Sequence, residues 1–93
     1  MPKLTITRFR ALILSLNYVV SIHAAEALDD DNLTILDLEN IILTGQIIER
    51  QRDRQTREVK YVIRGFTLDG LEGKTIVKIG PTGRLVVITV YLA

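Results

Sequence analysis

Residues 59–92, VKYVIRGFTLDGLEGKTIVKIGPTGRLVVITVYL, decide the fold. β-Branched and aromatic residues form three segments of this stretch, separated by glycine, aspartate and proline, which is the pattern of strands joined by tight turns. We predict strands over residues 59–67, 74–79 and 84–92, with a hairpin loop at Asp69-Gly70 and Glu72-Gly73. Residues 80–83, GPTG, have proline at the favoured second position of a turn. A further strand is predicted over residues 46–51.

Upstream of these strands, apolar residues recur at helical spacing. The first helix is predicted to begin at Thr5 or Thr7 and to end near Leu16, with its apolar stripe formed by Ile6, Phe9, Leu12, Ile13 and Leu16. Strong helix formers over residues 23–28 predict a second helix, after a short extended connection at residues 19–21.

A third helix is predicted from the pair Thr34 and Asp37, which has the spacing of a capping box. Gly45 is placed to end this helix. Its predicted buried face consists of Ile35, Leu38, Ile41 and Ile42. Helices followed by hairpin-linked strands indicate the α+β class. We therefore expect two to three N-terminal helices packed on one face of a four-stranded antiparallel sheet, in one domain over residues 1–93.

Composition excludes several kinds of chemistry. The chain has 93 residues, no cysteine, one histidine and a net charge of +1, so we expect neither zinc–thiolate nor cysteine chemistry, and no metal or cofactor. The small net charge is the sum of two opposite charges. Residues 1–48 carry three basic and six acidic residues, and residues 49–93 carry nine basic and five acidic ones. Polar residues interrupt the apolar run near the N-terminus and no run is long enough to span a membrane, which favours a cytoplasmic protein.

Alternation along the strands predicts which side chains share the sheet face away from the helices. In the last strand the even-numbered residues Val86, Ile88, Val90 and Leu92 are aliphatic and are assigned to the core. The same reasoning places Thr75, Val77 and Ile79 inward, and gathers Lys60, Arg64, Lys78, Thr89 and Tyr91 on the open face. Cations with a hydroxyl and a phenol suit a phosphodiester. The alternative is that lysine and arginine simply occupy exposed strand positions.

His23 is the natural candidate for a general acid or base, since histidine titrates near neutral pH. The alternative is a histidine near a helix end that bonds a backbone carbonyl. The run Asp29-Asp30-Asp31 is interpreted as a solvated helix terminus rather than as a cation site.

Several short motifs resemble those of a widespread bacterial family, domain of unknown function 4258. They are Ser21-Ile22-His23-Ala24, Thr44-Gly45-Gln46-Ile47-Ile48-Glu49, Tyr61-Val62-Ile63-Arg64-Gly65 and the ending around Thr89 and Tyr91. Their order and spacing agree with the family over residues 5–92. The family is similar to the RelE-like and MqsR-like toxins, which implies the RelE/barnase-like toxin fold.

The resemblance implies a toxin of a toxin–antitoxin module that cleaves RNA without a metal. It assigns the catalytic roles to His23, Arg64, Thr89 and Tyr91, and the alternation of the strands adds Lys78. Lys60, Arg57 and Arg54 are the candidate RNA-binding residues. The expected partners are a short antitoxin protein and RNA, and self-association through the apolar first helix is a further expectation.

One departure from the family pattern lies in the second helix. Many members carry arginine four and eight residues after the histidine, where this chain has Ala27 and Asp31. The acidic run thus replaces positive potential near the expected substrate backbone. The alternative is therefore a noncatalytic binding or regulatory protein on the same fold, which acts through protein–protein contacts.

Overall fold

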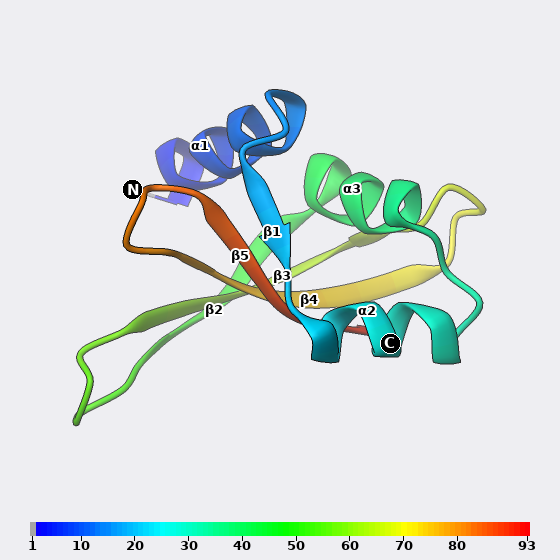
Figure 1. Cartoon of the computed structure of the whole chain (residues 1–93). Coiled ribbons are helices and arrows are strands. Elements are labelled where there is room, and N and C mark those ends of the chain that lie inside the picture. The colour runs from blue at the N-terminus through cyan, green and yellow to red at the C-terminus, as the bar shows by residue number, and fades with distance from the viewer. Residues whose placement is uncertain (1) are drawn as a thin grey trace.

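A computed structural model describes residues 2–93, with side chains described from Thr5 onward. Within this range the helices are α1 (Pro2–Leu14), α2 (Ile22–Asp30) and α3 (Ile35–Thr44). The strands are β1 (Tyr18–Val20), β2 (Gln46–Arg52), β3 (Val59–Phe66), β4 (Glu72–Ile79) and β5 (Leu85–Leu92). They form one sheet with the order β1-β5-β4-β3-β2 (Figure 1). The predicted α+β class is confirmed.

The predicted four-stranded antiparallel sheet is wrong, because the sheet has five strands and is mixed. β1 pairs in parallel with β5, and Tyr18 lies opposite Leu85. The Leu85 amide donates to the Asn17 carbonyl at 3.1 Å, and the Ser21 amide donates to the Val87 carbonyl at 3.0 Å. A strand of three residues carries too little alternation to be recognised, and its partner lies far away in the sequence.

The first helix begins earlier than predicted. It starts at Pro2 rather than at Thr5 or Thr7, since proline at the first helical position loses no hydrogen bond. Leu16 is exposed although it was assigned to the apolar stripe, because it lies past the helix end with a left-handed backbone at φ 60°. The other four stripe residues are buried or pack against the core.

The third helix has the predicted capping box. The Thr34 hydroxyl accepts from the Asp37 amide at 3.3 Å, and the Asp37 carboxylate accepts from the Thr34 amide at 2.9 Å. Ile35 is largely exposed, against the prediction, while the other three residues of the predicted buried face are fully buried.

Three glycines let α3 lie directly on the sheet. A Cβ atom at Gly65 would come within 2.0 Å of the Ile41 carbonyl oxygen, and one at Gly45 within 2.4 Å of the same atom. A Cβ at Gly73, which pairs with Gly65 across the ladder, would lie 2.7 Å from the Ile41 side chain. Gly45 does end α3, but its extended backbone (φ −88°, ψ 171°) is open to any residue. Close packing, rather than a left-handed turn, requires glycine there.

β5 contains a bulge at Ile88. Its pairing with β4 steps from Thr89 to Val87 without using Ile88. An extra residue reverses the alternation of side chains. The predicted inward set of even-numbered residues is therefore correct after the bulge, where Val90 is buried, and wrong before it, where Val87 faces the core.

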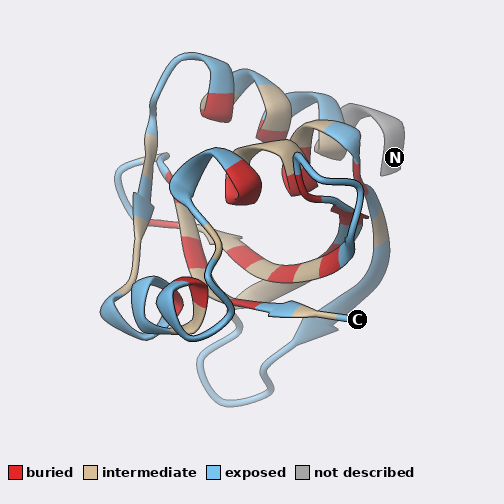
Figure 2. Ribbon diagram, turned by 90° about the vertical axis from the view of Figure 1, so that its right-hand side faces the viewer, coloured by how far each residue is buried: buried red, intermediate tan, exposed pale blue. Residues whose placement is uncertain are grey.

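The helices and the inner face of the sheet share one core. In Figure 2 the sheet curves around a central helix, and buried segments line the inside of the curve. Phe9 of α1 packs edge-on against Tyr61 of β3, with ring centroids 5.1 Å apart and an interplanar angle of 74°. Among residues 2–93, no helix combines the length and the apolar character needed to cross a membrane.

Candidate functional site

The open face is the side of the sheet that carries no helix. Register on the three central strands assigns to it Lys60, Val62, Arg64 and Phe66 of β3, Glu72, Lys74, Ile76 and Lys78 of β4, and Val86, Thr89 and Tyr91 of β5. All five sheet residues that the sequence placed together, Lys60, Arg64, Lys78, Thr89 and Tyr91, lie within this set. Alternation succeeded here because Thr89 and Tyr91 follow the bulge.

One row across the open face combines two cations with an aromatic ring. Arg64 lies opposite Lys74, and Lys74 lies opposite Tyr91. Neighbouring strands are about 4.8 Å apart, so the row spans about 10 Å. Phe66, two residues beyond Arg64, is 48% exposed, and Tyr91 is 40% exposed. Lys74 was not singled out from the sequence, although the alternation that selects Lys78 also selects it.

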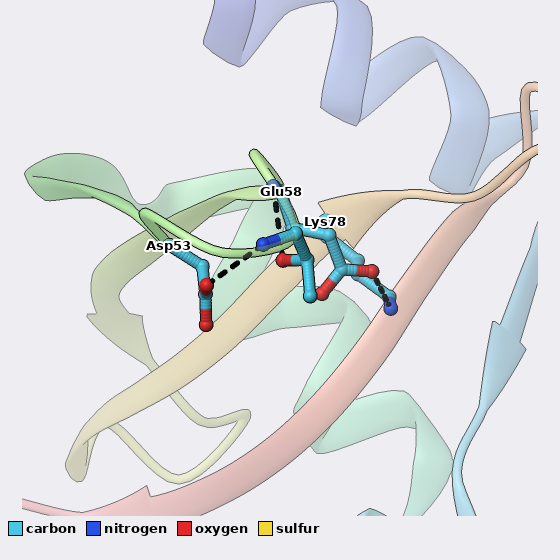
Figure 3. A network of polar contacts seen from close by, with 4 residues as sticks. Asp53, Glu58 and Lys78 are labelled. Atoms are coloured by element: carbon cyan, nitrogen blue, oxygen red, sulfur yellow. Dashed lines mark hydrogen bonds and ion pairs between the residues drawn. The ribbon is translucent and has the colours of Figure 1, made fainter.

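Lys78 is engaged at the other end of the open face. Its ammonium group lies 2.6 Å from the Glu58 carboxylate, as Figure 3 shows, and the two side chains are 27% and 41% exposed. This is the only ion pair among the described residues. Since Glu58 offsets the charge of Lys78, that lysine is less available to a phosphate than Arg64 or Lys74.

An uncharged row separates the two cationic ends of the open face. It consists of Val62, Ile76 and Thr89, which lie opposite one another on successive strands. Val62 is only 5% exposed although no helix covers this face. Its neighbours along the strand are Lys60 and Arg64, and the apolar stems of such side chains commonly cover buried surface.

Arg54 and Arg57 belong to the loop between β2 and β3, not to the open face. This loop projects from the body of the sheet (Figure 1). The Asp53 carboxylate accepts from the amides of Gln55 and Thr56 at 2.8 and 3.0 Å, and these bonds lower the pKa of Asp53. Arg57 has a left-handed backbone at φ 62°. Of the three predicted RNA-binding residues, only Lys60 therefore lies on the open face, at the end opposite to Arg64.

His23 lies apart from the other predicted catalytic residues. It is exposed in the first turn of α2, where a shallow depression is lined by His23, Glu26, Ala27, Asp29 and Asp30. α2 packs against β5, and both β5 and β4 separate it from the strand of Arg64. The depression contains none of the open-face residues. The structure thus divides the five predicted catalytic residues between two places.

Ser21, in the predicted connection, has a structural role that the sequence reasoning missed. Its hydroxyl caps α2 by accepting from the Ala24 amide at 3.0 Å, and it donates to the Ile88 carbonyl at 2.9 Å. The cap thus holds the carbonyl of the bulged residue. A serine directly before strong helix formers is a recognisable start signal and could have revealed the cap.

α3 holds the end of β3 that presents Arg64 and Phe66. The Thr44 hydroxyl accepts from the Phe66 amide at 3.0 Å, and the Asn40 side-chain amide donates to the Phe66 carbonyl at 2.8 Å. These bonds fix the backbone on which the exposed aromatic ring stands.

The described residues include no group of three or more histidine, aspartate and glutamate side chains arranged to hold a metal ion. The family model "Domain of unknown function (DUF4258)" matches residues 20–92, so the chain belongs to this family. The match begins at the end of β1 and leaves α1 outside it. No curated protein and no solved structure shows a significant match to the chain.

Proposed function

We propose that this protein binds single-stranded RNA on the open face of its sheet and acts as a small RelE-like ribonuclease toxin. The observation that carries the proposal is the row of Arg64, Lys74 and Tyr91, with the exposed ring of Phe66 beside it. Arginine and lysine bind phosphate groups, and aromatic side chains stack on unpaired bases. The combination favours single-stranded RNA over a duplex, whose bases are already stacked.

Cleavage on this surface would use attack of a ribose 2′-oxygen on the adjacent phosphorus, with departure of the 5′-oxygen of the next nucleotide. The 2′-hydroxyl would lose its proton to water and the departing 5′-oxygen would take one up from water, unless His23 supplies these transfers. Arg64 and Lys74 would stabilise the negative charge that develops on the phosphate oxygens. The hydroxyl groups of Tyr91 and Thr89 would position the phosphate. His23 would act as acid or base only if the RNA extended from the row to α2.

A second candidate, a noncatalytic RNA-binding protein, is favoured by two specific observations. His23 lines the same depression as Glu26, Asp29 and Asp30 of its own helix, and Lys78 is bound to Glu58. Two of the five groups expected to act in catalysis are therefore away from the row or already paired.

Binding is tested by fluorescence anisotropy with a labelled single-stranded RNA of mixed sequence. Arg64→Gln and Lys74→Gln should each weaken binding about tenfold, since a hydrogen bond to a charged group is worth about 1.5–3 kcal/mol. Each should also make the slope of the logarithm of affinity against the logarithm of salt concentration shallower, by about the amount that one phosphate contact contributes. Arg8→Gln, an exposed arginine of α1, is the matched control and should leave the affinity unchanged. Equal losses in all three variants would contradict a site on the open face.

Cleavage is tested separately on the same RNA at saturating protein. The ribonuclease proposal predicts product with the wild-type protein and a large loss with Arg64→Gln. His23→Ala distinguishes a site that reaches α2, which loses activity, from one confined to the sheet, which keeps it. Binding without product would establish the noncatalytic candidate instead.

A further inference from the structure

The outer edge of β2 is an unpaired strand edge. β2 is the last strand of the sheet, and only β3 pairs with it among residues 2–93. At its start, the Arg10 guanidinium donates to the Gly45 carbonyl at 2.7 Å, so α1 covers the first position. Beyond that point residues 48–52 are all exposed. The opposite edge strand, β1, has only three residues.

The backbone groups on this edge can be identified from the hairpin. The Asp53 amide donates to the Glu58 carbonyl at 2.9 Å, and the register continues from there to Glu49 opposite Val62. Hydrogen-bonded and non-bonded pairs alternate in an antiparallel ladder. The backbone groups of Gln51 and Glu49 therefore bond to β3, whereas the alternate residues, Arg50 and Arg52, turn their amide and carbonyl groups outward.

Those outward residues are Arg50 and Arg52. Their side chains project to the same side of the strand, as residues two positions apart do. Neither forms an ion pair with any residue of the described range. Glu49 projects to the other side, where its carboxylate accepts from the Gln51 side chain at 2.6 Å. The free edge is thus lined by unneutralised positive charge.

We infer that the outer edge of β2 is the docking site of an extended acidic segment of a partner protein, which adds a sixth strand to the sheet. The amide and carbonyl groups of Arg50 and Arg52 would pair with the backbone of that segment. Acidic side chains at every second position would face the two guanidinium groups. The exposed side chain of Ile48 at the bulge of β2 would contact an apolar residue at one end.

The alternation of donors and acceptors favours a peptide over RNA at this edge. Phosphate oxygens can accept from the amides but leave the carbonyl groups without a donor, whereas a strand satisfies both. The site is also distinct from the open face, because the side chains of Arg50 and Arg52 lie on the side of the sheet opposite to Arg64. This inference therefore stands independently of RNA binding.

The test measures binding of the full chain to a synthetic peptide of alternating glutamate and valine by isothermal titration. Three altered peptides separate the contributions: one has glutamine in place of glutamate, and two carry N-methyl groups on alternate backbone amides, one in each of the two possible registers. The double variant Arg50→Gln/Arg52→Gln should bind the parent peptide at least about tenfold more weakly. Arg8→Gln/Arg84→Gln, which removes the same charge from exposed positions elsewhere, should bind normally.

Both N-methylated peptides keep the charge, but the one methylated on the amides that face β2 cannot form the ladder, so at least one of the two should lose binding. Equal binding of both registers and the parent would overturn the inference, because the surface would then be a simple anion patch. Equal losses in the two double variants would overturn it as well. Arg64→Gln should leave peptide affinity unchanged, which separates this outcome from failure of the RNA proposal.

Discussion

The inner and open faces of the same sheet are under different physical constraints. On the inner face, the Ile41 carbonyl leaves no room for a Cβ at Gly65 or Gly45. On the open face, Arg64 of β3 and Tyr91 of β5 project outward with much of their surface exposed. Substitutions on the inner face should therefore change stability, and substitutions on the open face should change binding.

The largest effect is expected at Gly65. A Cβ there would force the backbone of α3 away from β3, so Gly65→Ala should lower the free energy of unfolding by about 3 kcal/mol, at the upper end for overpacking. Urea unfolding followed by circular dichroism measures the change. Gly70→Ala is the matched control, since a Cβ at Gly70 meets nothing within 4 Å and the cost comes only from its left-handed backbone. That cost is about 1 kcal/mol. Equal losses would show that α3 does not rest on the glycine.

The next largest effect is expected at Tyr91, where a substitution should change the RNA affinity and leave the free energy of unfolding unchanged. Tyr91→Leu removes the stacking ring and should weaken single-stranded RNA binding about tenfold, since stacking on one base is worth about 1–3 kcal/mol. Tyr91→Phe keeps the ring and removes only the hydroxyl group, so it should weaken binding less than Tyr91→Leu does. Anisotropy titrations and urea unfolding of both variants make the comparison. A parallel fall in stability would mean that Tyr91 belongs to the packed part of the sheet.

Asp37 connects α3 to the loop after β3, because it caps the helix and also accepts from the Leu68 amide of that loop, at 3.0 Å. Hydrogen bonds from the Thr34 and Leu68 amides lower the pKa of Asp37 in the folded state. Its stabilising contribution is therefore complete above the ordinary aspartate pKa of about 4 and is lost as the pH falls through the lowered value.

Asp37→Asn should consequently cost about 1 kcal/mol at pH 7. The difference from the wild-type protein should shrink as the pH falls below about 4. Urea unfolding at several pH values measures it, with Asp69→Asn, an exposed loop residue, as the control. A difference that stays constant with pH would assign the effect of Asp37 to packing.

Lys78 should give the smallest effect. The ion pair with Glu58 is partly exposed, so Lys78→Gln should lower the free energy of unfolding by no more than about 1 kcal/mol. Its effect on RNA affinity should be smaller than that of Arg64→Gln. Glu58→Gln, which releases the lysine, should strengthen RNA binding if phosphate reaches that end of the open face. If Lys78→Gln lost as much RNA affinity as Arg64→Gln, the ion pair between Lys78 and Glu58 would have to open when RNA binds.

Most local structure was predictable from the sequence. Strand boundaries agree within about two residues because β-branched runs and turn residues mark them. The largest difference is at the start of β4, since Glu72 and Gly73, predicted as loop residues, already belong to that strand. Gly73 resembles a turn residue, but it is required by the contact with Ile41.

The candidate site was predictable only in part. Alternation identified five of the open-face residues, yet it gave no information on whether Lys78 was already paired or on how far His23 lay from Arg64. The pairing of Lys78 depends on where the β2–β3 hairpin packs, and the distance of His23 from Arg64 depends on where α2 packs. Neither can be read from a short sequence motif.

By itself the sequence determined the α+β class, the capping box of α3 and five of the side chains that share the open face. These features depend on contacts within a few residues, or on the period of two along a strand. The tertiary structure decided that β1 joins β5 in parallel, that the bulge at Ile88 reverses alternation and that Glu58 pairs with Lys78. Each of these brings together residues distant in sequence, and such pairings are selected by the packing free energy of the whole chain rather than by local preference.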